Sequence, residues 1–413
     1  MKSFLKLLLP KSFYIMIMGD IISRIGDYIY ILGIPTYVLY LTNSPIWMGI
    51  SFGVQQSAVI FSGFLSGTIV DRNHPRKILI INAILQAVLV SLIPIFHALS
   101  LVNIYFIIID GFLLTSCSFL YKTSLNSLIP CIVIKENLPL ASSQISISKF
   151  FSKTIGPVLA GLSITLFTPI NSLWIDAASF FIVFLLMYLI DDKKDLIVNF
   201  ENKASKTNFI DDIKTGFFLV VQTKHILMLI LLNFMLNIGY VSMFSMFIFH
   251  LKQTLNLSSN TIGFIYSIDG IAVIIAGMLL PVLMNKLKNN TLISMTSIVM
   301  GICILSLGYA TNVVLIGLLF CSIMYCSQTI NRVMYTSWQM NFSIEYLGRI
   351  FSISSMLESL SVPLAGIISG IIVNKYNSFI LFRLSGISMI VSSVLFILFA
   401  KIFLLENQQS IEI

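Results

Sequence analysis

The chain has 413 residues, of which 57% are hydrophobic and only 10% are charged, and its mean hydropathy is +0.96. Soluble globular domains carry about 25% charged residues, so this composition excludes an ordinary soluble protein and indicates an integral membrane protein. The net charge of +8 does not indicate a nucleic-acid-binding protein, because the lysines and arginines gather at the ends of apolar segments instead of forming one basic patch.

Apolar segments of about 20 residues, each long enough to cross ~30 Å of hydrocarbon, recur along the whole sequence. They predict an all-α integral membrane fold, because the sequence does not show the alternating segments of about ten residues that a β-barrel requires. The predicted spans are 13–41, 47–70, 78–98, 102–125, 140–168, 173–190, 226–249, 258–284, 291–310, 312–338, 349–374 and 379–404. We therefore predict twelve transmembrane helices.

The first span contains three ionisable residues in the sequence GDIISRIGDYIY, which covers residues 19–30. Asp20, Arg24 and Asp27 follow an i, i+4, i+7 pattern and share one face of a helix. Such groups face a protein interior or a watery cavity, so they form either structural ion pairs or a site for protons and substrate. Because one arginine cannot satisfy two separated carboxylates, we assign proton coupling to Asp27 and a cytoplasmic-side pair to Asp20 and Arg24.

The segment after the second span, GTIVDRNHPRKILI, has an ordered pattern of glycine, acid and basic residues. These residues are Gly67, Asp71, Arg72, Arg76 and Lys77. An ordinary positive-inside loop would explain the basic residues alone. The Gly-x-x-x-Asp-Arg spacing resembles that of the major facilitator superfamily, although His74 stands at the usual glycine and Pro75 at the first basic position of the later pair. The resemblance implies the major facilitator fold, with two pseudo-symmetric six-helix halves and transport by alternating access.

The same resemblance implies a cytoplasmic gate. In the family, the aspartate of this loop latches the two halves near the start of the eleventh span, so Asp71 is expected to face the N-terminal dipole of that span near Arg349. The equivalent loop of the second half, PVLMNKLKNN, has Asn285 and Lys286 at the corresponding positions. Replacing Asp71 with Asn is expected to impair transport without abolishing membrane insertion.

The fourth and fifth spans carry two further family features. Asp110 lies where many members have an arginine-containing motif, and that arginine is missing here, so its proton-transfer role does not carry over. In the fifth span, KTIGPVLAG resembles the Gly-Pro-x-x-Gly-Gly element of antiporter members. Its residues are Gly156, Pro157, Ala160 and Gly161, with Ala160 in place of a glycine. Generic packing of small residues is the alternative explanation.

The longest polar segment divides the chain into halves of six spans. We predict an N-terminal half at 1–190, a cytoplasmic linker at 191–225 with an amphipathic surface helix at 209–221, and a C-terminal half at 226–413. Basic residues concentrate in the loops and tails that share the side of the N-terminus. The positive-inside rule then places both termini in the cytoplasm.

Other charged residues lie within the spans. Asp269 in the eighth span and Glu358 in the eleventh could recognise protons or cations, and Asp176 is expected to hold a structural hydrogen bond. Lys149 and Lys153 either line the cytoplasmic cavity or snorkel to the membrane surface, with snorkelling slightly favoured. Arg332 and Arg383 could balance the acids.

The order and spacing of several segments, including LTNSPIWMG, IDAASF and DDIKTGFFLVV, resemble the macrolide-efflux branch of bacterial drug exporters. This implies a proton-coupled exporter of amphipathic drugs or natural products in the bacterial cytoplasmic membrane. Uptake or facilitated transport of a small metabolite is the alternative, since the same fold supports it. We expect the protein to work as a monomer in contact with membrane lipid.

The sequence also argues against other classes of function. The four histidines are isolated, and the sequence contains neither a nucleotide-binding loop nor cysteines at metal-ligand or disulfide spacing. We therefore expect a protein that is not an enzyme, with no metal, no cofactor and no nucleic-acid partner, and with the proton gradient as its energy source.

Overall fold

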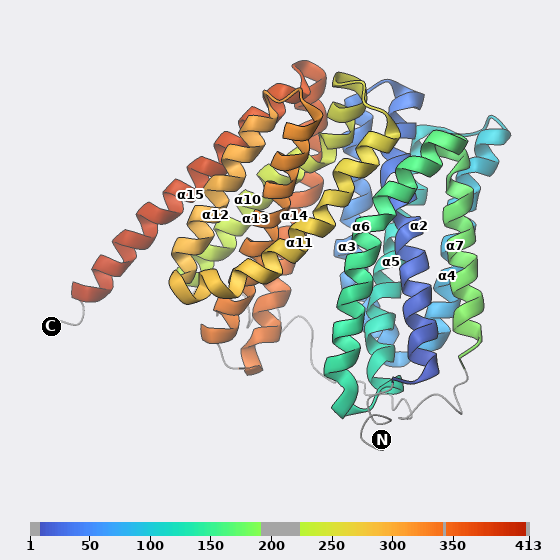
Figure 1. Ribbon diagram of the computed structural model, residues 1–413, viewed down its shortest axis with the longest axis horizontal. Coiled ribbons are helices and arrows are strands. Elements are labelled where there is room, and N and C mark those ends of the chain that lie inside the picture. The colour runs from blue at the N-terminus through green and yellow to red at the C-terminus, as the bar shows by residue number, and fades with distance from the viewer. Residues whose placement is uncertain (1–8, 191–223, 342–343, 410–413) are drawn as a thin grey trace. The chain divides into compact units, whose positions relative to one another are not determined.

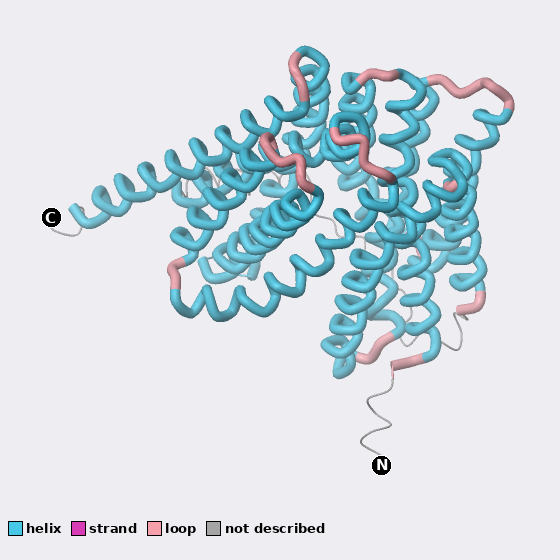
Figure 2. The backbone as a smooth tube through the Cα atoms, turned by 45° about the horizontal axis from the view of Figure 1, so that its top comes forward, coloured by secondary structure: helices cyan, strands magenta, loops and turns pink. Residues whose placement is uncertain are grey.

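The computed structural model describes residues 9–190, 224–341 and 344–409, and the regular structure in these ranges is helical (Figures 1 and 2). The first six α-helices are α2 (Lys11–Thr42), α3 (Pro45–Arg72), α4 (Pro75–Ala98), α5 (Ile104–Ile132), α6 (Leu138–Asn171) and α7 (Leu173–Tyr188). The next six are α10 (Lys224–Phe249), α11 (Ser259–Lys286), α12 (Asn289–Leu307), α13 (Val313–Asn341), α14 (Ile344–Lys375) and α15 (Ser378–Gln409). A 3₁₀ turn, η1 (Lys135–Asn137), precedes α6, and a π-helical turn, η2 (His250–Thr254), follows α10.

Each of the twelve predicted spans coincides with one of these helices. Within the described residues, nine helical segments are long and apolar enough to cross a membrane, and α7 is apolar but has only 16 residues. The predicted fourth span ends too early, because α5 continues to Ile132. Polar residues such as Asn126 end an apolar segment without ending a helix. The surface helix predicted at 209–221 lies outside the described residues.

The chain forms two compact units with the same pattern of helix packing. The first unit holds α2, α3 from Val54 onward, α4 to α7, and the start of α11 up to Gly270. The second holds Ser44–Gly53, which includes the start of α3, together with α10, α11 from Ile271 onward, and α12 to α15. In the first unit α2 packs on α6 and α7, and α4 packs on α5 and α7. In the second unit α10 packs on α14 and α15, and α12 packs on α13 and α15, as expected for a repeated six-helix arrangement.

Small residues allow close helix crossings within both units. In the first unit, a Cβ atom added to Gly161 of α6 would lie 2.5 Å from the carbonyl oxygen of Ser259 at the start of α11. In the second unit, a Cβ atom added to Gly53 of α3 would lie 2.9 Å from the carbonyl oxygen of Pro363 in α14. Backbones approach this closely only where side chains are missing.

Helix α2 packs against α7 through glycines seven residues apart. A Cβ atom on Gly19 would lie 3.1 Å from the methyl carbon of Met187, and one on Gly26 would collide with Asp176 and Ser179. Since α7 occupies this face of α2, the charged residues that follow the glycines lie beside the contact: Asp20 borders α5 and α6, and Asp27 borders α4 and α5. The glycine spacing therefore sets the position of the charged face.

Candidate functional site

The charged face of α2 contains one ion pair and one unpaired acid. The Nε of Arg24 donates a hydrogen bond to Oδ2 of Asp20 at 2.7 Å, and the Asp20 side chain is buried. Asp27 lies one helical turn further along α2, and within the described residues it has no hydrogen-bond or ion-pair partner. The structure thus separates a paired carboxylate from a free one on the same helix face.

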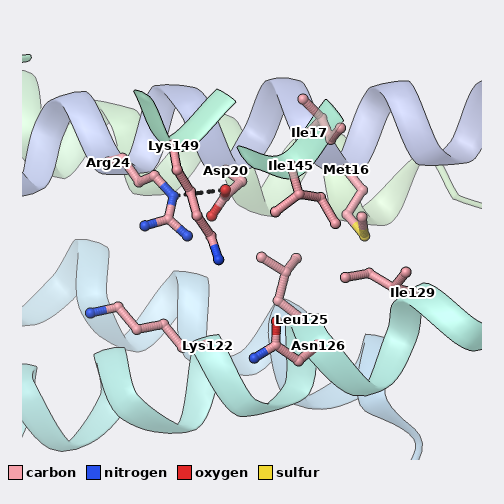
Figure 3. Close-up of a pocket in the computed structure, with 10 residues that line it drawn as sticks. All are labelled: Met16, Ile17, Asp20, Arg24, Lys122, Leu125, Asn126, Ile129, Ile145 and Lys149. Atoms are coloured by element: carbon pink, nitrogen blue, oxygen red, sulfur yellow. Dashed lines mark hydrogen bonds and ion pairs between the residues drawn. The ribbon is translucent and has the colours of Figure 1, made fainter. Parts of the chain in front are cut away.

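A cavity of about 310 Å³ lies between α2, α5 and α6, beside this ion pair (Figure 3). Its polar part contains Asp20, Arg24, Lys122 of α5 and Lys149 of α6. Arg24 and Lys149 extend from one wall of the pocket and Lys122 from the facing wall. The remaining wall is formed mainly by Met16, Ile17, Leu125, Ile129 and Ile145. The pocket therefore has a cationic end and an apolar end.

A smaller cleft of about 10 Å³ adjoins Asp27, Arg24 and Lys122. Gln86 of α4 donates a hydrogen bond from Nε2 to the hydroxyl of Ser118 of α5 at 2.8 Å, and both residues line the cleft. A polar cleft of this size is close to the minimum that holds one water molecule. Asp27 is therefore placed where it can exchange a proton with a small polar space.

Asp110 is the most isolated carboxylate in the first unit. Its side chain is buried in α5, and neither carboxylate oxygen has a hydrogen-bond partner within the described residues. Asp176, in contrast, accepts a hydrogen bond from the hydroxyl of Ser179 at 3.4 Å in the first turns of α7, as expected from the sequence. An unpartnered buried carboxylate in a membrane protein marks a candidate proton site.

A second ion pair joins α6 to α11. The Nζ of Lys153 lies 2.8 Å from Oδ2 of Asp269, and both side chains are largely shielded from solvent. The expectation that Lys153 snorkels is therefore wrong, because a carboxylate on the neighbouring helix holds its ammonium group. Lys149, one turn earlier, lines the pocket described above. The sequence did not suggest the pair, since its members lie far apart along the chain.

The second unit contains a polar centre of another kind around Glu358 of α14. Its Oε1 accepts hydrogen bonds from the amide of Asn233 in α10 and, at 3.1 Å, from the hydroxyl of Ser354. Asn237 of α10 donates to the backbone oxygen of Glu358 at 3.1 Å and to the hydroxyl of Ser361 at 2.7 Å. Sequence reasoning missed the two asparagines, although their i, i+4 spacing in an otherwise apolar span was the available signal.

Among the residues that the structure describes, Arg383 does not pair with an acid, contrary to expectation. Its Nε donates to the backbone oxygen of Gly308 at 3.1 Å, and its guanidinium lies 3.9 Å from the ring centre of Tyr309. Arg332 likewise forms no ion pair within the described residues. A helix-terminal carbonyl and an aromatic ring satisfy Arg383 without a carboxylate.

The sequence pattern of the predicted gate begins within a helix. Gly67 and Asp71 belong to the last turns of α3, which ends at Arg72. Arg76 of α4 donates from Nε and Nη2 to the carbonyl oxygens of Met187 and Tyr188, at 3.0 and 2.9 Å. Lys77 is exposed. The side chains of Asp71 and Arg349 lie outside those described, so their gate contact stays a prediction.

The Gly-Pro element of α6 serves as a packing surface. A Cβ atom on Gly156 would collide with the ring of Tyr28 in α2, and Gly161 meets α11. Pro157 and Ala160 are buried between these contacts. The element therefore joins α6 to two neighbours, while its role in antiport stays a prediction.

Apolar helices in two units of matching packing, with ionisable groups inside them, define a multi-pass membrane protein of the transporter class. The sequence profile of the Major Facilitator Superfamily matches residues 16–365, and the chain belongs to this family. The family confirms the fold predicted from the sequence.

Macrolide efflux proteins match most of the chain at low identity. Macrolide efflux protein A of Streptococcus pyogenes is 23% identical over 379 residues, which cover 91% of this chain and 92% of that protein. Macrolide efflux protein A of Enterococcus faecalis is 22% identical over 300 residues, covering 72% of this chain and 92% of that protein. These matches confirm the resemblance to the macrolide-efflux branch.

Solved structures with the same fold include transporters of different cargo. The nucleoside transporter NupG has a TM-score of 0.77 at 14% identity, covering 94% of this chain and 98% of that one. A bacterial homologue of the iron transporter ferroportin, in an inward-facing state, has a TM-score of 0.77 at 14% identity and covers 94% and 98%. At these identities the similarity shows the fold and not the cargo.

Proposed function

We propose that this transporter is a proton-coupled exporter of amphipathic drugs or natural products, such as macrolides, that works by alternating access. Export is supported by the match to macrolide efflux proteins over 91% of the chain and by the antiporter-like element in α6. We place the protein in the bacterial cytoplasmic membrane with both termini in the cytoplasm, working as a monomer among membrane lipids. The proton gradient supplies the energy, and no bound cofactor takes part.

The observation that carries the coupling proposal is the unpaired carboxylate of Asp27. It lies beside the pocket and the small polar cleft, within electrostatic range of Arg24 and Lys122. Taking up or losing a proton at Asp27 changes the charge that a bound cargo meets. A cationic cargo binds best when Asp27 is ionised, so proton uptake and cargo release are linked, as antiport requires.

The experiment that tests this proposal uses the purified protein in liposomes. A macrolide gradient is applied, and the luminal pH is followed with a trapped dye. The wild type should move protons opposite to the macrolide, Asp27→Asn should lose this proton movement, and Asp27→Glu should retain it. Macrolide transport without proton movement, or unchanged coupling in Asp27→Asn, would assign a structural role to the α2 charges. Asp110, Asp269 and Glu358 would then be the next candidates.

A second candidate function is uptake or facilitated movement of a small metabolite. It is favoured by the pocket between α2, α5 and α6, since three cationic side chains are poorly suited to a cationic drug. Transport assays in right-side-out and inverted vesicles discriminate the two functions. Export predicts gradient-driven accumulation in inverted vesicles, and uptake predicts it in right-side-out vesicles.

A further inference from the structure

The pocket between α2, α5 and α6 has an excess of positive charge. Three cations, Arg24, Lys122 and Lys149, line it together with one carboxylate, that of Asp20, which leaves two positive charges unbalanced. Arg24 is paired with Asp20 at 2.7 Å, whereas within the described residues neither lysine ammonium has a carboxylate within 4.0 Å. Ionised Asp27 in the adjoining cleft lowers the excess to one positive charge.

This excess, contributed by the exposed side chains of Lys122 and Lys149, contrasts with the ion pairs of the first unit. Lys153 has Asp269 as its partner, and Arg24 has Asp20. Charges inside membrane proteins pair with one another or mark the path of a substrate or ion. Within the described residues Lys122 and Lys149 have no carboxylate partner, and both line one cavity, from the facing helices α5 and α6 (Figure 3).

The rest of the pocket has the chemistry of an apolar receptor. Isoleucine, leucine and methionine side chains from all three helices form its other end, and the volume of about 310 Å³ is at the lower limit of the range typical of small-molecule sites. Asn126 adds an amide that can donate to a further oxygen atom. A compact molecule with one anionic end and one apolar end matches this distribution.

We propose that this pocket binds an amphipathic organic anion, whose carboxylate or phosphate contacts Lys122, Lys149 and Arg24 and whose apolar body contacts Met16, Leu125 and Ile145. The proposal rests on the transport part of the proposed function, and the binding it describes is measured without transport. It names the charge class of the ligand, for which neither the family nor the relatives provide information.

Binding of an anion in this pocket would affect proton coupling. A proton on Asp27 would leave the neighbouring cations less neutralised, so the anion and the proton would each strengthen the binding of the other. An organic anion carried through this pocket would therefore travel together with protons, as in the second candidate function. A cationic drug would instead compete with the proton.

A matched series of ligands tests the charge preference without any variant. The probes are 2-naphthoate, 2-naphthamide and 2-naphthylmethylammonium, which share one ring system and differ in charge. Equilibrium binding to the detergent-purified wild type is measured by microscale thermophoresis. The naphthoate should bind at least about tenfold more tightly than the amide, as expected for one added charge-assisted contact, and the ammonium should bind most weakly. Equal affinities, or tighter binding of the ammonium, would overturn the proposal.

Variants then locate the site. Lys149→Gln and Lys122→Gln should each weaken naphthoate binding about tenfold or more and leave naphthamide binding unchanged, while Lys149→Arg should preserve binding. The control is Lys135→Gln, because Lys135 is an exposed lysine of η1 outside the pocket. Undiminished naphthoate binding in both pocket variants would show that the anion binds elsewhere.

Two lipid compositions distinguish the possible sources of the anion. Naphthoate binding is repeated in nanodiscs of phosphatidylcholine and in nanodiscs that contain phosphatidylglycerol. If naphthoate binds more weakly in the phosphatidylglycerol nanodiscs, and Lys149→Gln removes this difference between the two lipids, the occupant of the pocket is a lipid headgroup. Equal naphthoate binding in the two lipids would identify a soluble anion. Because the binding measurements need no gradient, a failure of the anion proposal can be separated from a failure of the export proposal. Macrolide-driven proton movement can persist without naphthoate binding, and naphthoate binding can persist without macrolide-driven proton movement.

Discussion

Two ion-paired carboxylates of the first unit, Asp20 and Asp269, are held differently from the Glu358 carboxylate of the second unit. In the first unit Asp20 pairs with Arg24 and Asp269 pairs with Lys153, so each of these acids neutralises a cation. In the second unit the Glu358 carboxylate accepts hydrogen bonds from Asn233 and Ser354, which are both neutral. The helix pairing is the same in the two units, yet their electrostatics differ.

This difference determines which partner groups would lose their charged acceptor when the carboxylate takes up a proton. A proton on Asp20 would leave Arg24 without its partner, and an uncompensated charge inside a membrane protein is costly. A proton on Glu358 would leave only an amide and a hydroxyl, and the hydroxyl can reverse its role from donor to acceptor. Glu358 can therefore gain and lose charge at a lower cost than Asp20, while the cations of the first unit are suited to recognising a charged ligand.

The largest effect on stability is expected for Asp20→Asn. The amide keeps an acceptor for Arg24 but removes the compensating charge, and we expect a loss of about 2 kcal/mol in the free energy of unfolding in detergent. The loss is below the roughly 3–5 kcal/mol typical of fully buried pairs, because the Arg24 side chain is 24% exposed and Asp27 is within electrostatic range. Reversible unfolding monitored by tryptophan fluorescence measures it.

The control for this prediction is a double-mutant cycle. Arg24→Gln in the Asp20→Asn background removes the orphaned cation and should recover part of the lost stability. If Asp20→Asn costs less than about 0.5 kcal/mol, the pair is not a structural element and the contrast between the two units is broken.

The number of helices and their positions along the chain could be predicted from the sequence, whereas the pairing of charges between helices could not. Hydropathy locates twelve helices because each must cover the same thickness of hydrocarbon, and the i, i+4 spacing of Asp20 and Arg24 brings them together on any helix. Lys153 and Asp269 lie on different helices, and their contact depends on how α6 and α11 cross, which apolar periodicity does not encode. For the same reason the excess charge contributed by Lys122 and Lys149 appears only once the helices are assembled.

A smaller effect is expected for Gly161→Ala at the crossing of α6 and α11. The added methyl group would lie 2.5 Å from the Ser259 carbonyl oxygen, and a backbone atom cannot move aside as a flexible side chain can. We expect a loss of about 1–2 kcal/mol in the free energy of unfolding. The matched control is Gly63→Ala, where the nearest atom is 4.0 Å from the added carbon and a small gain in helix stability is expected. Equal stabilities of the two variants would show that this crossing is not close-packed.

The smallest effect on stability is expected for Glu358→Gln, and this variant sharpens the comparison most. The side-chain amide oxygen can accept the same hydrogen bonds from Asn233 and Ser354, so we expect a loss below about 1 kcal/mol in the free energy of unfolding. Asp20→Asn is the same change from carboxylate to amide at an ion-paired site, and the two variants compared in one assay isolate the effect of the partner's charge.

A transport measurement on Glu358→Gln then separates a structural acid from a coupling acid. Because an amide cannot carry a proton, a coupling role predicts that cargo-driven proton movement falls by at least about tenfold while the protein stays folded. If proton movement is unchanged in Glu358→Gln and lost in Asp27→Asn, coupling belongs to the first unit, beside the cations that would also sense the charge of the cargo. If proton movement is lost in Glu358→Gln alone, proton coupling and charge recognition belong to different units. The sign of the cargo's charge then places no electrostatic constraint on the direction of proton movement.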